Sequence, residues 1–236
     1  MIVVIQCARS KQKNAGHLKT NDGRPVAFVA HPEFAPPAVS CVYARPDDAS
    51  DAGGTWRDRL LAYNASPTNN PLGLLPAFEL YENDIYRAVV KQFGVENTYI
   101  LSAGWGLINA AFLTPAYDIT FSAQADDFVR RRKRDVFCDL CLLPANTTEH
   151  VVCFASKEYA PLFSALTNAV SGERIVFYNS ATPPLAPGCK LVKFDTRTRT
   201  NWQYECAAAF LRGDLASICH RNGGAVSSDL AGSAVT

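Results

Sequence analysis

The chain has 236 residues, of which 48% are hydrophobic and 11% aromatic, so it can bury a full core. This composition argues against a disordered or fibrous protein. The formal net charge is only +1, so affinity for a polyanion has to come from a local basic patch and not from the field of the whole protein.

Apolar runs and their boundaries predict an alternation of strands and helices. We expect buried strands at residues 2–6, 97–103, 150–156 and 174–180. A small β hairpin or excursion is expected at about 24–50, between Pro, Gly and Asp residues. Helices are predicted at 55–66, 75–94, 124–138, 158–170 and 201–212. Thr55 is a candidate N-cap of the first helix, and Gly94 ends the second.

Strands separated by helices predict parallel pairing with right-handed crossovers. The predicted fold class is therefore α/β, with a mostly parallel central sheet and helices on both faces. We expect residues 1–213 to form a single domain that includes the excursion. The small and polar residues 214–236 are expected to form a mostly disordered tail.

The cysteines and the N-terminus bear on the compartment. The eight cysteines are scattered through apolar runs and are expected to be reduced core residues of a cytoplasmic protein. Only Cys138 and Cys141 form a CxxC pair, which is a weak zinc signal because a closed site needs four ligands. The apolar run at residues 2–5 is short and has no basic region before it, so no signal peptide or membrane span is expected.

Polar loops follow the predicted strands, and ligands of open α/β sheets bind where such loops meet. The strand ends predict one pocket, lined by Ser10, Lys11, Ser102, Trp105, Tyr117, Asp118 and Asn179. Asp118 follows a proline-stiffened segment and is flanked by Tyr117 and Ile119, which favours a desolvated general base. The alternative for Asp118 is an ordinary Asx-turn or helix cap.

Several other residues have two interpretations. Trp105, between Gly104 and Gly106, is either a stacking platform for a base or a core residue. Asn83 pairs with a base edge or belongs to a solvated helix face, with Tyr81 in the core. Cys7 is either a nucleophile or a buried structural thiol. Nucleotide-binding GxGxxG, Walker A and hydrolase GxSxG motifs do not occur in the sequence.

Basic residues occur in two places. Five consecutive cations, Arg130, Arg131, Arg132, Lys133 and Arg134, predict contact with phosphates, and the alternative is a solvated helix face. Arg197 and Arg199 lie beside Trp202 and Tyr204. Such interleaving of basic and aromatic residues is used by proteins that bind single strands or flipped bases.

Three segments, "VVIQCARSKQ", "YILSAGWGLI" and "FLTPAYDITFS", resemble a bacterial family that opens with a strand and Cys-Ser-Lys-x-Lys and carries "YILSAKYGLL" and "PYD". That family is distantly similar to the YaaA stress proteins and to the glycosidase-like domain of archaeosine synthase, and through them to the uracil-DNA glycosylase superfamily. It is also similar to a phage-defence DNA glycosylase that removes glucosylated hydroxymethylcytosine. The matched positions of the first motif are Ser10 and Lys11, and the Gly-Gln-Asp-Pro loop of uracil glycosylases is not found.

The resemblance implies a uracil-DNA glycosylase-like three-layer sandwich that hydrolyses the N-glycosidic bond of a modified base in phage DNA and leaves an abasic site. Such an enzyme flips the nucleotide and stabilises an oxocarbenium-like sugar. The expected catalytic residues are Asp118, which orients water or offsets the sugar's charge, with Asn83 and Ser10. The expected substrate-binding residues are Cys7, Lys11, Ser102, Gly104, Trp105, Tyr81, Tyr117 and Asn179. DNA is the expected partner, held by Arg130–Arg134, Arg197 and Arg199, and no metal or cofactor is expected.

Two other functions use the same pocket. The first is a non-catalytic DNA- or nucleotide-binding stress protein of the YaaA type. The second is a base-exchanging enzyme of tRNA modification, because exchange and hydrolysis differ only in the nucleophile that enters.

Overall fold

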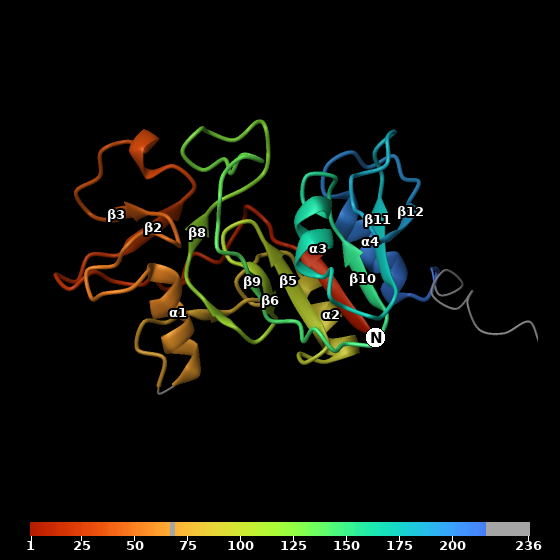
Figure 1. The fold of residues 1–236 in the computed structure, drawn as a ribbon, viewed down its shortest axis with the longest axis horizontal. Helices are drawn as coiled ribbons and strands as arrows, with labels where there is room; N and C mark the ends of the chain where they lie inside the picture. The colour runs from red at the N-terminus through yellow and green to blue at the C-terminus, as the bar shows by residue number, and fades with distance from the viewer. Residues whose placement is uncertain (67–68, 216–236) are drawn as a thin grey trace, which may run out of the picture.

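The computed structural model describes residues 1–66 and 69–215. Its centre is a seven-stranded sheet with the strand order β12-β11-β10-β1-β5-β6-β9 (Figure 1). The strands are β1 (Ile2–Gln6), β5 (Thr98–Ser102), β6 (Gly106–Asn109), β9 (Leu140–Cys141), β10 (Val151–Phe154), β11 (Arg174–Tyr178) and β12 (Lys190–Lys193). Pairing is parallel except between β5 and β6, which are antiparallel. The predicted α/β class with a mostly parallel central sheet is confirmed.

Strand β1 lies in the middle of this sheet, between β10 and β5. All five of its residues are buried, which is why its sequence is apolar on both faces and does not alternate. Helices α2 (Ile85–Phe93) and α4 (Trp202–Leu211) pack together against one face, and α3 (Ala160–Leu166) lies on the other (Figure 1). The helices predicted at 158–170 and 201–212 are thus present in shorter form.

Two smaller sheets accompany the central one. One consists of β2 (Val26–Val29), β3 (Val42–Ala44) and β8 (Tyr117–Asp118), and the other of β4 (Leu75–Pro76) and β7 (Leu113–Thr114). A short 3-10 helix, Pro32–Phe34, follows β2. The predicted β excursion at 24–50 is present, but β2 and β3 are parallel and so do not form a hairpin. The excursion is held by β8, a strand from far along the chain that pairs with β2.

Helix α1 (Trp56–Ala65) begins where the sequence predicts it. The Thr55 hydroxyl accepts a hydrogen bond from the Asp58 N–H, and the Asp58 carboxylate accepts one from the Thr55 N–H. This capping box satisfies two N–H groups that have no partner within the helix. Helix α2 ends at Gly94, as predicted, but starts at Ile85. The prediction of a helix over the whole of 75–94 is wrong, because its first part forms β4 and turns.

The prediction of a helix at 124–138 is wrong. This segment consists of turns held by hydrogen bonds to Thr120, whose N–H donates to the Val129 carbonyl and whose carbonyl accepts from the Arg131 N–H. The side chain of Arg131 is buried. Long-range contacts therefore override the local helical pattern here.

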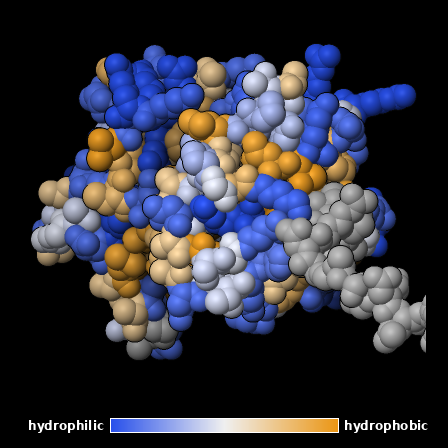
Figure 2. Space-filling view, turned by 45° about the vertical axis from the view of Figure 1, so that its right-hand side comes forward, coloured by the Kyte–Doolittle hydropathy of each residue, from blue (hydrophilic) through white to orange (hydrophobic). Residues whose placement is uncertain are grey.

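The seven described cysteines are free. Cys7, Cys153 and Cys206 are buried, as expected for core residues, whereas Cys138 and Cys141 are exposed and correct that expectation. The predicted tail over 214–236 lies almost wholly outside the described residues. Within the described part of the chain, no helix is both long enough and apolar enough to cross a membrane. Hydrophilic groups cover most of the face shown in Figure 2, with apolar groups in separate patches.

Candidate functional site

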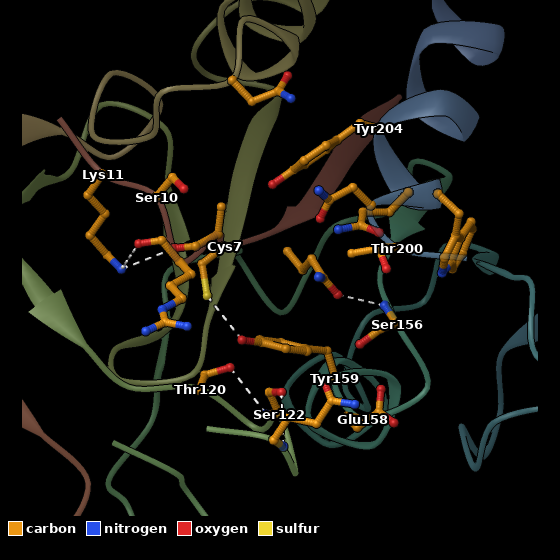
Figure 3. A pocket seen from close by; sticks show the side chains of 18 of the residues that line it. Cys7, Ser10, Lys11, Thr120, Ser122, Ser156, Glu158, Tyr159, Thr200 and Tyr204 are labelled. Atoms are coloured by element: carbon orange, nitrogen blue, oxygen red, sulfur yellow. Dashed lines mark hydrogen bonds between the residues drawn. The ribbon is translucent and has the colours of Figure 1, made fainter. Parts of the chain in front are cut away.

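A cleft of about 760 Å³ opens at the carboxyl end of β1 (Figure 3). Five segments line it: the end of β1 with the loop after it, the residues just before α2, the end of β8 with the segment after it, the loop after β10, and the residues around the start of α4. The lining residues are Gln6–Lys11, Glu82, Asn83, Asp118–Thr120, Ser122–Gln124, Ser156, Glu158, Tyr159 and Arg199–Tyr204. A parallel sheet brings loops together at this edge, so the location is the one that the strand order predicts.

The loop after β1 forms the floor of the cleft. The Gln6 side-chain oxygen accepts a hydrogen bond of 2.6 Å from the Ser156 N–H, which ties this loop to the loop after β10. The Cys7 sulfur lies 3.3 Å from the Tyr159 hydroxyl, and Figure 3 shows this pair facing each other across the cleft floor. Cys7 is buried. The floor is therefore fixed by contacts between segments about 150 residues apart in the sequence.

Asp118 reaches the cleft through strand β8. Tyr117 pairs with Phe28 and Asp118 with Val29 of β2. Because successive side chains of a strand point to opposite faces, Tyr117 enters the core and Asp118 lines the cleft. Asp118 is partly exposed, so water and a ligand can reach its carboxylate.

Lys11 lies on the same side of the cleft as Ser10 (Figure 3). Burial lowers the pKa of the Lys11 amine below its ordinary value, whereas the nearby Cys7 and Asp118 raise it and Arg9 lowers it further. The amine also lies 4.3 Å from the centre of the Tyr117 ring. The cleft therefore combines a carboxylate with a lysine whose positive charge is disfavoured.

A buried tyrosine network supports the floor from beneath. The Tyr117 hydroxyl lies 2.8 Å from the Tyr81 hydroxyl and accepts a hydrogen bond of 2.9 Å from Ser102. Ser102 in turn accepts from the N–H groups of Gly104 and Trp105. Burial raises the pKa of Tyr81 and of Tyr117 well above the ordinary value. These five residues, which we predicted to bind substrate, lie outside the set that lines the cleft.

Trp105 is a core residue and not an exposed stacking platform. Its side chain is fully buried, and its ring makes edge contacts with Phe28 at 5.0 Å and with Tyr117 at 6.4 Å between ring centres. The Arg57 guanidinium lies 5.5 Å from the ring centre. Trp105 thus joins the small β2 sheet to the central sheet, and the core interpretation of "SAGWGL" is the correct one.

Ser10 and Asn83 line the cleft, as predicted, and both are exposed. The Asn83 side-chain oxygen accepts a 2.9 Å hydrogen bond from the Ile85 N–H at the start of α2, so Asn83 also caps this helix. Asn179 lies outside the cleft lining, and its side-chain amide donates to the Thr198 carbonyl at 3.3 Å.

The basic run differs from the prediction of five free cations. Arg131 is buried in an ion pair with Asp139, so it cannot reach a DNA backbone. Arg130 and Arg132 both pair with Asp127 at 3.2 and 3.1 Å. Lys133 and Arg134 are exposed, and phosphate contact by these two residues stays a prediction. Arg199 lines the cleft and Arg197 does not.

Sequence reasoning missed part of the site. Glu158 and Tyr159 line the cleft from the loop after β10. The polar segment "ASKEYA", which follows a buried strand, is the sequence signal that could have indicated them. Arg9 lies between the two matched motif residues and the strand. Around the start of α4, the sequence indicated Arg199, Trp202 and Tyr204 but missed Thr200, Asn201 and Gln203, which also line the cleft.

Within the part of the chain that the structure describes, the CxxC pair belongs to no metal-binding cluster. Among the described residues, no group of three or more His, Cys, Asp or Glu side chains is placed to hold a metal ion.

Comparisons with protein-family models, with curated proteins and with solved structures find no significant match to this chain, so the site has to be interpreted from its own geometry.

Proposed function

We propose that the protein is a DNA glycosylase that hydrolyses the N-glycosidic bond of a modified base, of the glucosylated hydroxymethylcytosine type. The observation that carries the proposal is the composition of one cleft: Asp118 shares it with Lys11 and with the start of α4. Its volume of about 760 Å³ lies in the upper part of the range usual for small-ligand sites and accommodates a flipped nucleotide with a sugar substituent.

The charges suit the two halves of the reaction. Cleavage of an N-glycosidic bond leaves positive charge on the sugar and negative charge on the departing base. The Asp118 carboxylate offsets the former and directs water at the anomeric carbon. Arg9 and Arg199 line the same cleft and favour the latter.

The start of α4 adds positive potential. The Asn201 side chain makes no capping hydrogen bond, and Thr200, Asn201 and Trp202 line the cleft. Uncapped N–H groups at a helix N-terminus attract anions, so a phosphate of the flipped nucleotide is favoured there. Tyr204, which is partly exposed, offers ring surface at the same place, whereas the Trp202 side chain is buried.

The test is base release from DNAs that differ only in their cytosine modification. Release of free base, with equal formation of abasic sites, is expected for one modified DNA and not for unmodified DNA. Asp118→Asn should abolish release and keep DNA affinity. Asp126→Asn is the matched control, because Asp126 is exposed in the next loop and lies outside the cleft lining.

Two outcomes oppose the proposal. Full release by Asp118→Asn together with loss of release by Glu158→Gln would transfer the carboxylate role to Glu158, the other acidic residue on the α3 side of the cleft. Tight binding without release from any DNA would favour the non-catalytic binding function instead.

A further inference from the structure

The amine of Lys11 lies in the cleft without a carboxylate partner. Its Nζ donates hydrogen bonds to the backbone carbonyls of Ala8 at 3.1 Å and Arg9 at 3.4 Å. It forms no ion pair with any residue that the structure describes. A carboxylate in contact would favour the protonated amine. The groups around the Lys11 amine are instead these two carbonyls and the rings of Tyr117 and Tyr81, whose centres lie 4.3 and 5.9 Å away.

The surroundings of Lys11 favour the nucleophilic form of its amine. Burial lowers the pKa of Lys11, and this effect exceeds the opposing influence of the nearby Cys7 and Asp118. Desolvated lysines of this kind attack carbonyl carbons and form imines. In a cleft that produces abasic sugars, the available carbonyl is the C1′ aldehyde of the ring-opened sugar.

We infer that Lys11 forms an imine with C1′ of an abasic sugar and that the protein then cleaves the DNA strand as a β-lyase. The inference rests on the proposed function for the origin of the abasic site, but the chemistry itself requires only abasic DNA.

Each step conserves atoms and electrons. The Lys11 lone pair attacks C1′, the aldehyde oxygen takes up a proton, and loss of water leaves a protonated imine. The Asp118 carboxylate removes a proton from C2′, the electron pair forms the C2′–C3′ double bond, and the C3′–O bond breaks. The downstream strand leaves with a 5′-phosphate. Water then hydrolyses the imine, which restores the Lys11 amine and leaves an unsaturated aldehyde on the upstream strand.

Other amines are poorly placed for this reaction. The α-amino group of Met1 precedes β1 and therefore lies at the opposite edge of the sheet, 3.9 Å from Glu149. Lys13 is exposed and lies outside the cleft lining. The Lys157 amine lies 3.9 Å from the Glu158 carboxylate and outside the cleft lining.

The experiment uses duplex DNA with one abasic site, made beforehand with a separate uracil glycosylase. Incubation with the full-length protein and sodium borohydride should reduce the imine to a stable covalent adduct, seen as a slow band on a denaturing gel. Without borohydride, the strand should be nicked and carry the unsaturated aldehyde. Lys11→Arg, which retains the charge, should lose both products, whereas Lys13→Arg should keep them.

Peptide mapping of the wild-type adduct by mass spectrometry does not depend on the folding of a variant. Modification of Lys11 is expected. Absence of an adduct, or modification of another residue, would overturn the inference. Because the substrate is already abasic, base release from modified DNA without an adduct would leave the proposed glycosylase standing. An adduct without base release from any modified DNA would support the lyase activity and contradict the proposed glycosylase activity.

Discussion

The guanidinium of Arg131 forms a two-point ion pair with the carboxylate of Asp139, with nitrogen–oxygen distances of 2.7 and 2.6 Å. Both side chains are more than nine-tenths buried. Arg131 also donates to the Ala103 carbonyl at 2.8 Å, and its guanidinium lies 4.1 Å from the centre of the Phe137 ring. A residue from the basic run therefore fastens the turn after β5 to the segment before β9.

Replacing Arg131 by Ala should lower the free energy of unfolding by about 3–5 kcal/mol, because Asp139 would remain buried without its partner. Arg130→Ala is the control: its exposed pair with Asp127 should contribute about 0–1 kcal/mol. Urea unfolding followed by circular dichroism measures both. Equal, small losses in the two variants would mean that the buried pair does not stabilise the fold.

Gly106 allows a close approach of two strands. Its φ is +92°, and a Cβ atom there would lie 2.3 Å from the Leu140 carbonyl oxygen of β9. Gly23 has a similar φ of +87° but open space around it. Gly23→Ala should cost about 1–2 kcal/mol from backbone strain alone. Gly106→Ala should cost about 1–3 kcal/mol more, because β9 has to move. If urea unfolding showed equal losses of unfolding free energy in the two variants, β9 would be able to shift without an energetic cost.

The elements that could be predicted are those specified by their own residues. Strand β1 is a two-sided apolar run, α1 has its capping box, and α2 ends at a glycine with positive φ. The turns at 124–138 could not be predicted, because they depend on the hydrogen bonds of Thr120 with Val129 and Arg131 and on the contact of Arg131 with the distant Ala103. Pairing of β8 with β2 likewise depends on residues 89 positions apart, such as Phe28 and Tyr117.

Part of the candidate site could likewise be predicted from the sequence, and part could not. The convergence of Ser10, Lys11 and Asp118 follows from the rule that ligands bind at the carboxyl ends of parallel strands. Whether an aromatic residue at such an end lines the cleft or fills the core depends on the register of its strand. Tyr117 faces inward because of the register of β8, and Trp105 is buried in the turn between β5 and β6; the sequence carries no signal of either placement.

Buried tyrosines should make the fold sensitive to alkaline pH. Burial raises the pKa of Tyr81, Tyr86, Tyr117 and Tyr159 well above the unfolded value of about 10. Above that value the unfolded chain loses protons that the folded chain keeps, so stability falls as pH rises, by up to about 1.4 kcal/mol per pH unit for each tyrosine. The lowered pKa of Lys11 acts in the opposite direction below 10.5 and is common to wild type and a tyrosine variant.

Tyr86→Phe tests this dependence. It removes one titrating hydroxyl, together with its hydrogen bond to the Gln6 carbonyl, and leaves the ring. Compared with wild type, its free energy of unfolding should be lower at pH 8 and should fall less steeply between pH 10 and 12. Urea unfolding across this range measures both values. If the free energy of unfolding fell equally steeply in the two proteins, the raised pKa of Tyr86 would be contradicted.

Two groups of arginines differ in how well they are placed to contact a DNA backbone. Arg9 and Arg199 are exposed, line the cleft, and form no ion pair within the described part of the chain. Arg130 and Arg132 share the Asp127 carboxylate, which reduces their attraction for phosphates. Cations at the cleft entrance are thus better placed to hold the phosphates that flank a flipped nucleotide than those of the basic run.

Replacing both Arg9 and Arg199 by Ala should weaken DNA binding and reduce the slope of log affinity against log salt by about one to two, since each lost phosphate contact removes roughly 0.7–0.9. The double change of Arg130 and Arg132 to Ala should leave the slope nearly unchanged. The double change of Lys133 and Arg134 to Ala tests the exposed remainder of the run.

Preference among modified bases should stay the same in all three variants, because phosphate contacts position DNA and do not read bases. Fluorescence anisotropy between 50 and about 200 mM salt, a range over which such contacts change affinity strongly, measures the slopes. A reduced slope only in the Lys133 and Arg134 variant would move the DNA path away from the cleft and onto the turns around Lys133 and Arg134.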